Sequence, residues 1–121
     1  MKTKIIYFEI LIYSLEVACV LFLFYKPAIL AILLFVLSSI YLVIIKSKRL
    51  TIIYLLAMIV GPFAELAAIL RGAWVYLHPT IFGLPVWLPF AWGIVTMFIF
   101  RISEVINELL VKSDSKVHEK L

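Results

Sequence analysis

Apolar residues fill most of this chain in four long stretches, which cover residues 5–25, 27–45, 50–70 and 86–103. Each stretch is close to the length of about 20 residues that a helix needs to cross the core of a bilayer. The pattern predicts an all-α fold, an integral membrane four-helix bundle.

Short segments separate the stretches. Lys26 and Pro27 form a tight turn, and Pro27 suits the first turn of the following helix. Residues 46–49 form a short basic loop. Pro62 removes one helical hydrogen bond, so it is expected to break the third span.

The chain becomes polar after the fourth stretch. We expect the last helix to continue to about residue 111, so that residues 1–111 form one transmembrane domain. Residues 112–121 are then a polar cytoplasmic tail that frays. Four charged residues before the tail recur at helical spacing and predict a salt-bridged stripe facing solvent: Arg101, Glu104, Glu108 and Lys112.

The first stretch follows two lysines, as in a signal peptide. It is too long for the apolar core of such a peptide, contains Glu9 and Glu16, and lacks a cleavage site with small residues. We therefore interpret it as a retained span.

The distribution of basic residues predicts the orientation. With both termini in the cytoplasm, the outer side holds only Lys26 and Arg71. The inner side then holds eight basic residues: Lys2, Lys4, Lys46, Lys48, Arg49, Lys112, Lys116 and Lys120. The positive-inside rule thus favours a multi-pass protein of the cell membrane with N-in/C-in topology.

This topology places residues 71–85 on the outer face. The segment is rich in Pro, Gly and aromatic residues, and Trp and Tyr favour the headgroup region. Irregular backbone at that depth must be covered by protein or line a wet cavity. We expect a Trp/Pro-rich cap between the third and fourth helices.

Composition agrees with a membrane protein. The chain is 66% hydrophobic and 15% charged, whereas soluble domains have roughly half and a quarter. The net charge of +4 does not indicate nucleic acid, because the basic residues sit in short clusters between the apolar stretches. A single cysteine, Cys19, excludes an internal disulfide and a cysteine-based metal site. No phosphate loop, metal-ligand cluster or serine nucleophile motif occurs, so no cofactor is expected.

Two opposite charges lie at similar depth in the first and fourth spans. Glu9 lies roughly 6 Å from the inner end of its span, at about 1.5 Å per residue, and Arg101 lies at a comparable depth. A buried ion pair would lower the cost of both charges. The alternative is that each side chain extends to the inner headgroups.

Glu16 falls near the middle of the first span, on the same helix face as Glu9 and Tyr13. Ser38 and Ser39 reach a similar depth in the second span. Desolvation favours the protonated form of such an acid. Glu16 is then either a neutral packing residue or a group that carries protons or binds a cation or polar headgroup.

Glu65 lies near the outer end of the third span, shortly after Pro62. A kink with exposed backbone beside an acid is a way to build a polar pocket in a membrane. Four later residues are close enough in sequence to close over it: Arg71, Trp74, Tyr76 and His78. In the alternative interpretation Glu65 pairs with Arg71 or caps the loop, His78 is solvated, and the tryptophans form an interfacial belt.

Eight residues in order resemble a pattern of polytopic carotenoid-biosynthesis proteins of the carotenoid hydratase type: Glu65, Gly72, Trp74, Tyr76, Gly83, Pro85, Pro89 and Trp92. The resemblance covers about 30 residues. It implies that Glu65 is the acid that protonates an isoprenoid double bond. It also implies that an aromatic group faces the resulting cation: Trp74, Tyr76, Trp87 and Trp92.

Three functional hypotheses follow. The first is binding of a lipid or isoprenoid-like ligand in an outer-leaflet pocket around Glu65, with acid-catalysed chemistry as an extension. The second is a dimeric proton- or cation-coupled transporter that uses Glu16, since the chain is similar to small multidrug resistance transporters in size and topology. The third is a non-catalytic accessory subunit with a membrane partner. A sizeable ligand would require a homodimer, because four spans enclose little volume.

Overall fold

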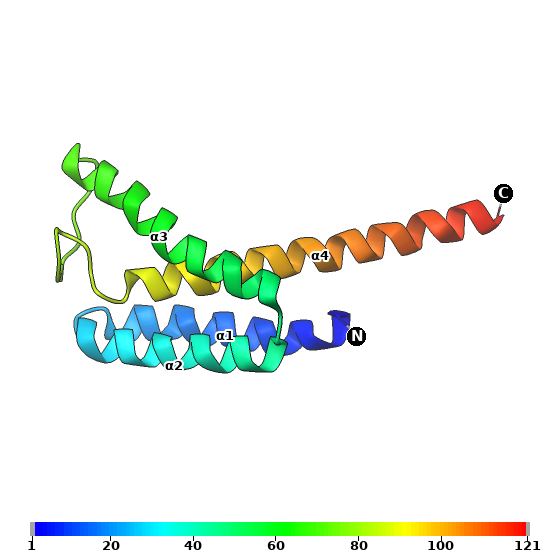
Figure 1. Cartoon of the computed structure of the whole chain (residues 1–121), viewed down its shortest axis with the longest axis horizontal. Helices are drawn as coiled ribbons and strands as arrows, with labels where there is room; N and C mark the ends of the chain where they lie inside the picture. The colour runs from blue at the N-terminus through cyan, green and yellow to red at the C-terminus, as the bar shows by residue number, and fades with distance from the viewer. Residues whose placement is uncertain (1, 121) are drawn as a thin grey trace.

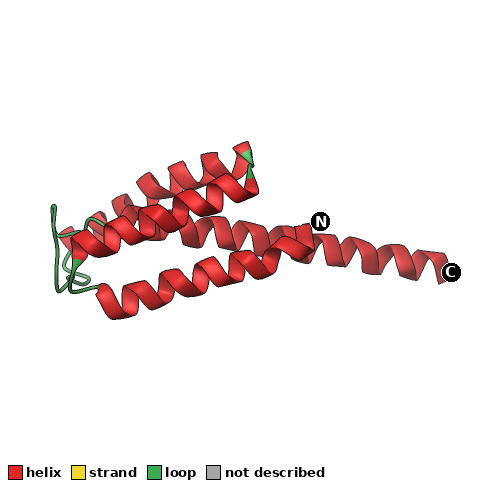
Figure 2. Ribbon diagram, turned by 90° about the horizontal axis from the view of Figure 1, so that it is seen from below, coloured by secondary structure: helices red, strands yellow, loops and turns green. Residues whose placement is uncertain are grey.

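The computed structural model describes residues 2–120 of the chain, and the side chains of residues 5–120. The lysine side chains at positions 2 and 4, which count towards the predicted orientation, lie outside the described part. The fold is all-helical (Figures 1 and 2). Its four helices are α1 (Lys2–Leu23), α2 (Pro27–Ile45), α3 (Lys48–Leu70) and α4 (Leu88–Lys120).

Three helices within the described residues are long and apolar enough to cross a membrane: α1 from Ile5 to Leu23, α2, and α3. Many large apolar side chains on their outer faces are exposed, which suits contact with lipid. These features indicate a membrane protein. The fourth stretch, predicted as a span over 86–103, forms the start of α4, and α4 is not among the three.

The turns between the first three helices have local causes. Pro27 begins α2, where its fixed φ suits the first helical turn. Lys46 ends the same helix in the left-handed conformation, and its N–H donates to the carbonyl of Leu42. The Ser47 side chain then caps α3 by accepting the N–H of Leu50 at 3.2 Å. Only two residues therefore separate α2 from α3.

Helix α4 is the centre of the arrangement, because it packs against each of the other three helices. α1 and α2 form an antiparallel pair. α3 packs mainly on α4, and it diverges from the α1–α2 pair towards its own C-terminal end at Leu70 (Figure 1). The start of α1 and the end of α4 lie at the same end of the bundle, beyond which α4 projects (Figures 1 and 2).

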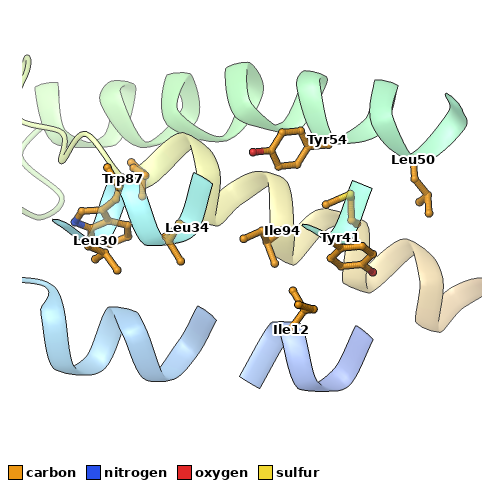
Figure 3. Close-up of a cluster of buried hydrophobic side chains, with 11 residues drawn as sticks. Ile12, Leu30, Leu34, Tyr41, Leu50, Tyr54, Trp87 and Ile94 are labelled. Carbon is orange, nitrogen blue, oxygen red and sulfur yellow. The ribbon is translucent and has the colours of Figure 1, made fainter. Parts of the chain in front are cut away.

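The core lies where α1, α2 and α4 meet, with α3 closing it from one side (Figure 3). Its centre is made by side chains with no exposed surface: Leu30, Leu34, Tyr41, Ile94 and Met97. Trp87 packs at one end of this cluster, near Leu30 (Figure 3).

Two glycines bring α3 and α4 into close contact. A Cβ atom on Gly61 would lie 2.2 Å from the Trp92 indole, and one on Gly93 would lie 2.3 Å from the Tyr54 ring. Each helix thus presents a glycine to an aromatic ring of the other. Close approach through small residues is the usual way for helices to pack in lipid.

The structure corrects two expectations about the helices. α3 continues through Pro62 instead of breaking there. Pro62 and the preceding Gly61 are buried, so packing offsets the one hydrogen bond that proline removes. α4 runs on to Lys120, where a fraying tail from 112 was predicted, because no Gly or Pro follows Gly93 and the Glu108–Lys112 pair at 3.7 Å supports the helix.

The connection between α3 and α4, residues 71–87, is irregular as predicted. Its one β-bridge joins Ile81 to Leu84 around a tight turn at Phe82 and Gly83, both with positive φ. Two central residues with positive φ define a type I′ turn, in which glycine is favoured.

Candidate functional site

Glu65 is the centre of the candidate site. It lies on α3, one turn beyond Pro62, and is half-buried. The hydroxyl of Tyr76 donates to Oε1 of Glu65, and the indole Nε1 of Trp92 donates to Oε2. The site therefore joins α3, the 71–87 connection and α4 through one carboxylate.

Trp92 is held in place from α3 itself. Its ring lies against Gly61, one helical turn before Glu65, where no larger residue fits. Gly61 and Glu65 are four residues apart and so share one face of the helix. Gly61 leaves the space that the Trp92 ring occupies, and Glu65 accepts the hydrogen bond from the indole N–H of Trp92.

Tyr76 reaches Glu65 from the connection. It is half-buried, and its ring meets the edge of Trp87 at a centroid distance of 6.3 Å. Burial raises the pKa of Tyr76, and the hydrogen bond to Glu65 and the negative charge of Glu65 raise it further. Tyr76 therefore keeps its proton at neutral pH and remains a donor.

Two apolar cavities adjoin this site through residues next to Glu65, although Glu65 itself lines neither of them. A groove of about 300 Å³ between α3 and α4 has Gly61 and Trp92 in its wall, with the remaining lining from Ile53, Leu56, Ala57, Val60, Thr96 and Phe100. A second cavity of about 210 Å³ lies under the connection and is lined by Pro62 and Leu66 of α3 together with residues between Ile81 and Pro89.

Several predicted partners of Glu65 lie elsewhere. Arg71 and Trp74 are exposed, and the described residues show no ion pair between Arg71 and Glu65. His78 is also exposed, with its ring 5.9 Å from that of Phe24. Trp87 does not contact Glu65 directly; it is buried behind Tyr76, and its Nε1 has no hydrogen-bond partner.

The predicted pair of Glu9 and Arg101 is formed in the half of the bundle where α1 begins. Arg101 Nε lies 2.8 Å from Oε1 and 2.9 Å from Oε2 of Glu9. Glu9 has no exposed surface and Arg101 is 4% exposed, so neither side chain extends to the headgroups. Arg101 is thus not part of a solvent-facing stripe, although it does contact Glu104 at 3.0 Å.

Sequence reasoning missed two members of the cluster around Glu9 and Arg101. The hydroxyl of Tyr41 donates to Glu9 Oε1 at 2.6 Å. Arg49 lies 3.9 Å from Glu104 and so links α3 to α4. Tyr41 lies in the second span at the depth of Glu9, which is the signal that could have identified it.

Glu16 is buried in α1, with 5% of its surface exposed. Its Oε2 atom has no hydrogen-bond partner. The Tyr54 hydroxyl lies beside Ser38 and close enough to Glu16 to interact with it electrostatically.

No group of three or more His, Cys, Asp or Glu residues in the described part of the chain could hold a metal ion. The Glu65 side chain itself offers carboxylate oxygens as hydrogen-bond acceptors. An ionised carboxylate has about four acceptor positions, of which Tyr76 and Trp92 use two. A ligand with a hydroxyl or amine could bind at the others.

The chain matches no known family model, no curated protein and no solved structure. Any functional inference therefore depends on the site itself.

Proposed function

We propose that this protein is a multi-pass membrane protein, with both termini in the cytoplasm, that binds a lipid or isoprenoid-like ligand at Glu65 in the outer leaflet. One observation carries the proposal. Glu65 joins α3, α4 and the 71–87 connection through hydrogen bonds from Tyr76 and Trp92, and apolar cavities flank this arrangement. Apolar walls with a few convergent polar groups are typical of ligand sites.

The cavities favour a long, thin apolar group. A groove of about 300 Å³ is at the small end of ligand pockets, so it suits a segment of an acyl or prenyl chain whose remainder lies in the bilayer. The polar end of the ligand would donate a hydrogen bond to Glu65. The distribution of basic residues, eight on the inner side against two on the outer, supports an outer-leaflet position.

The arrangement supports binding more directly than acid catalysis. Both oxygens of Glu65 accept hydrogen bonds, as an ionised carboxylate does, whereas protonation of an isoprenoid double bond needs a carboxylic acid. Acid catalysis at this site would therefore require Glu65 to gain a proton when the ligand binds. Trp92 would then be the nearest ring able to stabilise a cation.

Removing either donor is expected to weaken ligand binding. Trp92→Phe and Tyr76→Phe keep an aromatic ring but leave Glu65 with one donor, so the carboxylate loses its fixed position. A net hydrogen bond to a charged group contributes about 1.5–3 kcal/mol, which corresponds to a loss of at least tenfold in affinity. The measurement is photo-crosslinking with a lipid that carries a diazirine in its chain, followed by mapping of the labelled peptides.

The control is Trp74→Phe, because Trp74 is exposed and the described contacts of Glu65 do not include it. Wild type and Trp74→Phe should be labelled in the α3–α4 groove, and the two donor variants should lose that label. Equal labelling of all four proteins would exclude a role for the Glu65 hydrogen bonds.

A further inference from the structure

Glu16 is a second buried acid, and the ligand site does not use it. It lies within the apolar part of α1, between Ile5 and Leu23, and 95% of its surface is covered. Its Oε2 atom is buried without a hydrogen-bond partner. Buried polar atoms almost always have one, so an unpartnered carboxylate oxygen requires an explanation.

Two hydroxyl groups from other helices lie in the same region. Tyr54 of α3 reaches towards α4 (Figure 3), and its hydroxyl lies beside Ser38 of α2 and within electrostatic range of Glu16. Three helices therefore contribute one oxygen-bearing side chain each to the middle of the bundle.

The position of Tyr54 depends on a glycine in the fourth helix. A Cβ on Gly93 would lie 2.3 Å from the Tyr54 ring, so any larger residue would displace the tyrosine. Gly93 is buried within α4. This packing holds the Tyr54 hydroxyl in the polar region of an otherwise apolar core.

A count of protons shows what the cluster lacks. Ser38 donates its only proton to the carbonyl of Leu34 at 2.7 Å, so its oxygen can only accept. An ionised Glu16 would also only accept, and Tyr54 would be the single donor for two acceptor groups, Ser38 and Glu16. A protonated Glu16 adds the missing donor and removes an uncompensated charge from the apolar interior.

We propose that Glu16, Ser38 and Tyr54 form a proton-binding site in the middle of the bundle, with the exchangeable proton carried by Glu16. This site is separate from the one at Glu65. It would allow the protein to take up and release a proton within the membrane.

The titratable groups that act on Glu16 are few in the described part of the chain. Cys19 lies one turn further along α1, and Tyr54 faces Glu16 from α3. α2 contributes Ser38, which does not titrate. On α4 the charged group at the core is Arg101, which binds Glu9 and Glu104 instead. A pH-dependent change at this site is therefore caused by Glu16 gaining or losing its own proton and not by the titration of a neighbouring group.

Dicyclohexylcarbodiimide tests this site directly. A protonated carboxyl adds across one C=N bond of the reagent: the proton moves to nitrogen, the carboxyl oxygen bonds to carbon, and the adduct rearranges without a leaving group to a stable N-acylurea. An ionised carboxylate has no proton to supply. The reagent is added to purified protein in detergent over a series of pH values, and peptides are mapped by mass spectrometry.

We expect Glu16 to be labelled at neutral pH and to be labelled less in samples that react at higher pH, with full labelling restored when a sample is returned to neutral pH before the reagent is added. Glu9, which is paired with Arg101, should stay unlabelled. Glu16→Gln should remove the label without lowering the melting temperature, because Gln is a neutral replacement of the same shape. Absence of label at Glu16, labelling that does not change with pH, or a large loss of stability in Glu16→Gln would each overturn the proposal.

Discussion

Arg101→Leu is expected to lower the free energy of unfolding by about 3–5 kcal/mol, the cost of leaving a buried charge without its partner. Glu9→Gln is expected to lower it by less, because Arg101 keeps its contact with Glu104. Both side chains are almost completely covered, and the guanidinium holds both oxygens of Glu9 within 2.9 Å. In Arg101→Leu the unpaired charge is the glutamate, whereas in Glu9→Gln the arginine loses Glu9 and keeps Glu104, at 3.0 Å.

The double variant Glu9→Gln/Arg101→Leu should recover most of this loss, because no buried charge then remains unpaired. Tyr41 can still donate to the amide oxygen of Gln at position 9. The measurement is unfolding of the four proteins by titration with sodium dodecyl sulfate, followed by circular dichroism. Additive losses in the double variant would show that the pair is not what stabilises this end of the bundle.

A matched control is a less buried pair on the same helix, Lys112 and Glu108, whose side chains are 65% and 30% exposed and lie 3.7 Å apart. Glu108→Gln and Lys112→Leu should each change stability by less than about 1 kcal/mol, because surface ion pairs contribute little. The contrast between the two pairs separates the effect of burial from the effect of charge removal.

Gly61→Ala and Gly93→Ala are expected to destabilise the contact between α3 and α4 by about 1–3 kcal/mol each, the typical cost of inserting a methyl group into a packed interface. The new Cβ would lie 2.2 Å from Trp92 or 2.3 Å from Tyr54, so a ring must move in either case. In an open helix the same change would instead stabilise by up to about 1 kcal/mol, because alanine favours helix. A lower melting temperature of the alanine variants would therefore support close packing at these glycines, and a higher one would contradict it.

The two glycine variants also serve as controls for each other. Gly61→Ala displaces Trp92, a hydrogen-bond donor to Glu65, and should reduce ligand retention. Gly93→Ala displaces Tyr54, which does not contact Glu65, and should leave retention close to that of the wild type. If both variants retained the same amount of bound ligand, the position of the Trp92 ring would not affect ligand binding.

The position of a residue along the length of the bundle could be predicted from the sequence, because the length of each apolar stretch and the spacing of the charges indicate it directly. Pro27 at the start of α2 and the juxtaposition of Glu9 with Arg101 both follow from such one-dimensional reasoning. α3 passes through Pro62 because its buried face packs on α4, and that contact depends on residues far away in the sequence.

The angular arrangement of the side chains could not be predicted in the same way. Tyr76 and Trp92 meet at Glu65, whereas three residues that are closer to Glu65 in sequence than Trp92 is are exposed and do not bind it: Arg71, Trp74 and His78. The path of residues 71–87 decides which of them reaches the acid, and the turn at Phe82 and Gly83 that shapes this path is set by local backbone conformation. Composition alone does not distinguish these residues.

The central claim is that Glu65 holds a lipid or isoprenoid-like ligand. Native mass spectrometry of protein extracted gently from its own membrane tests this most directly, with wild type, Glu65→Gln and the control Glu119→Gln, which makes the same chemical change at an exposed position. The account predicts a specific bound amphiphile on wild type and Glu119→Gln that is absent from Glu65→Gln. An unliganded wild-type protein, or the same bound mass on all three proteins, would contradict it.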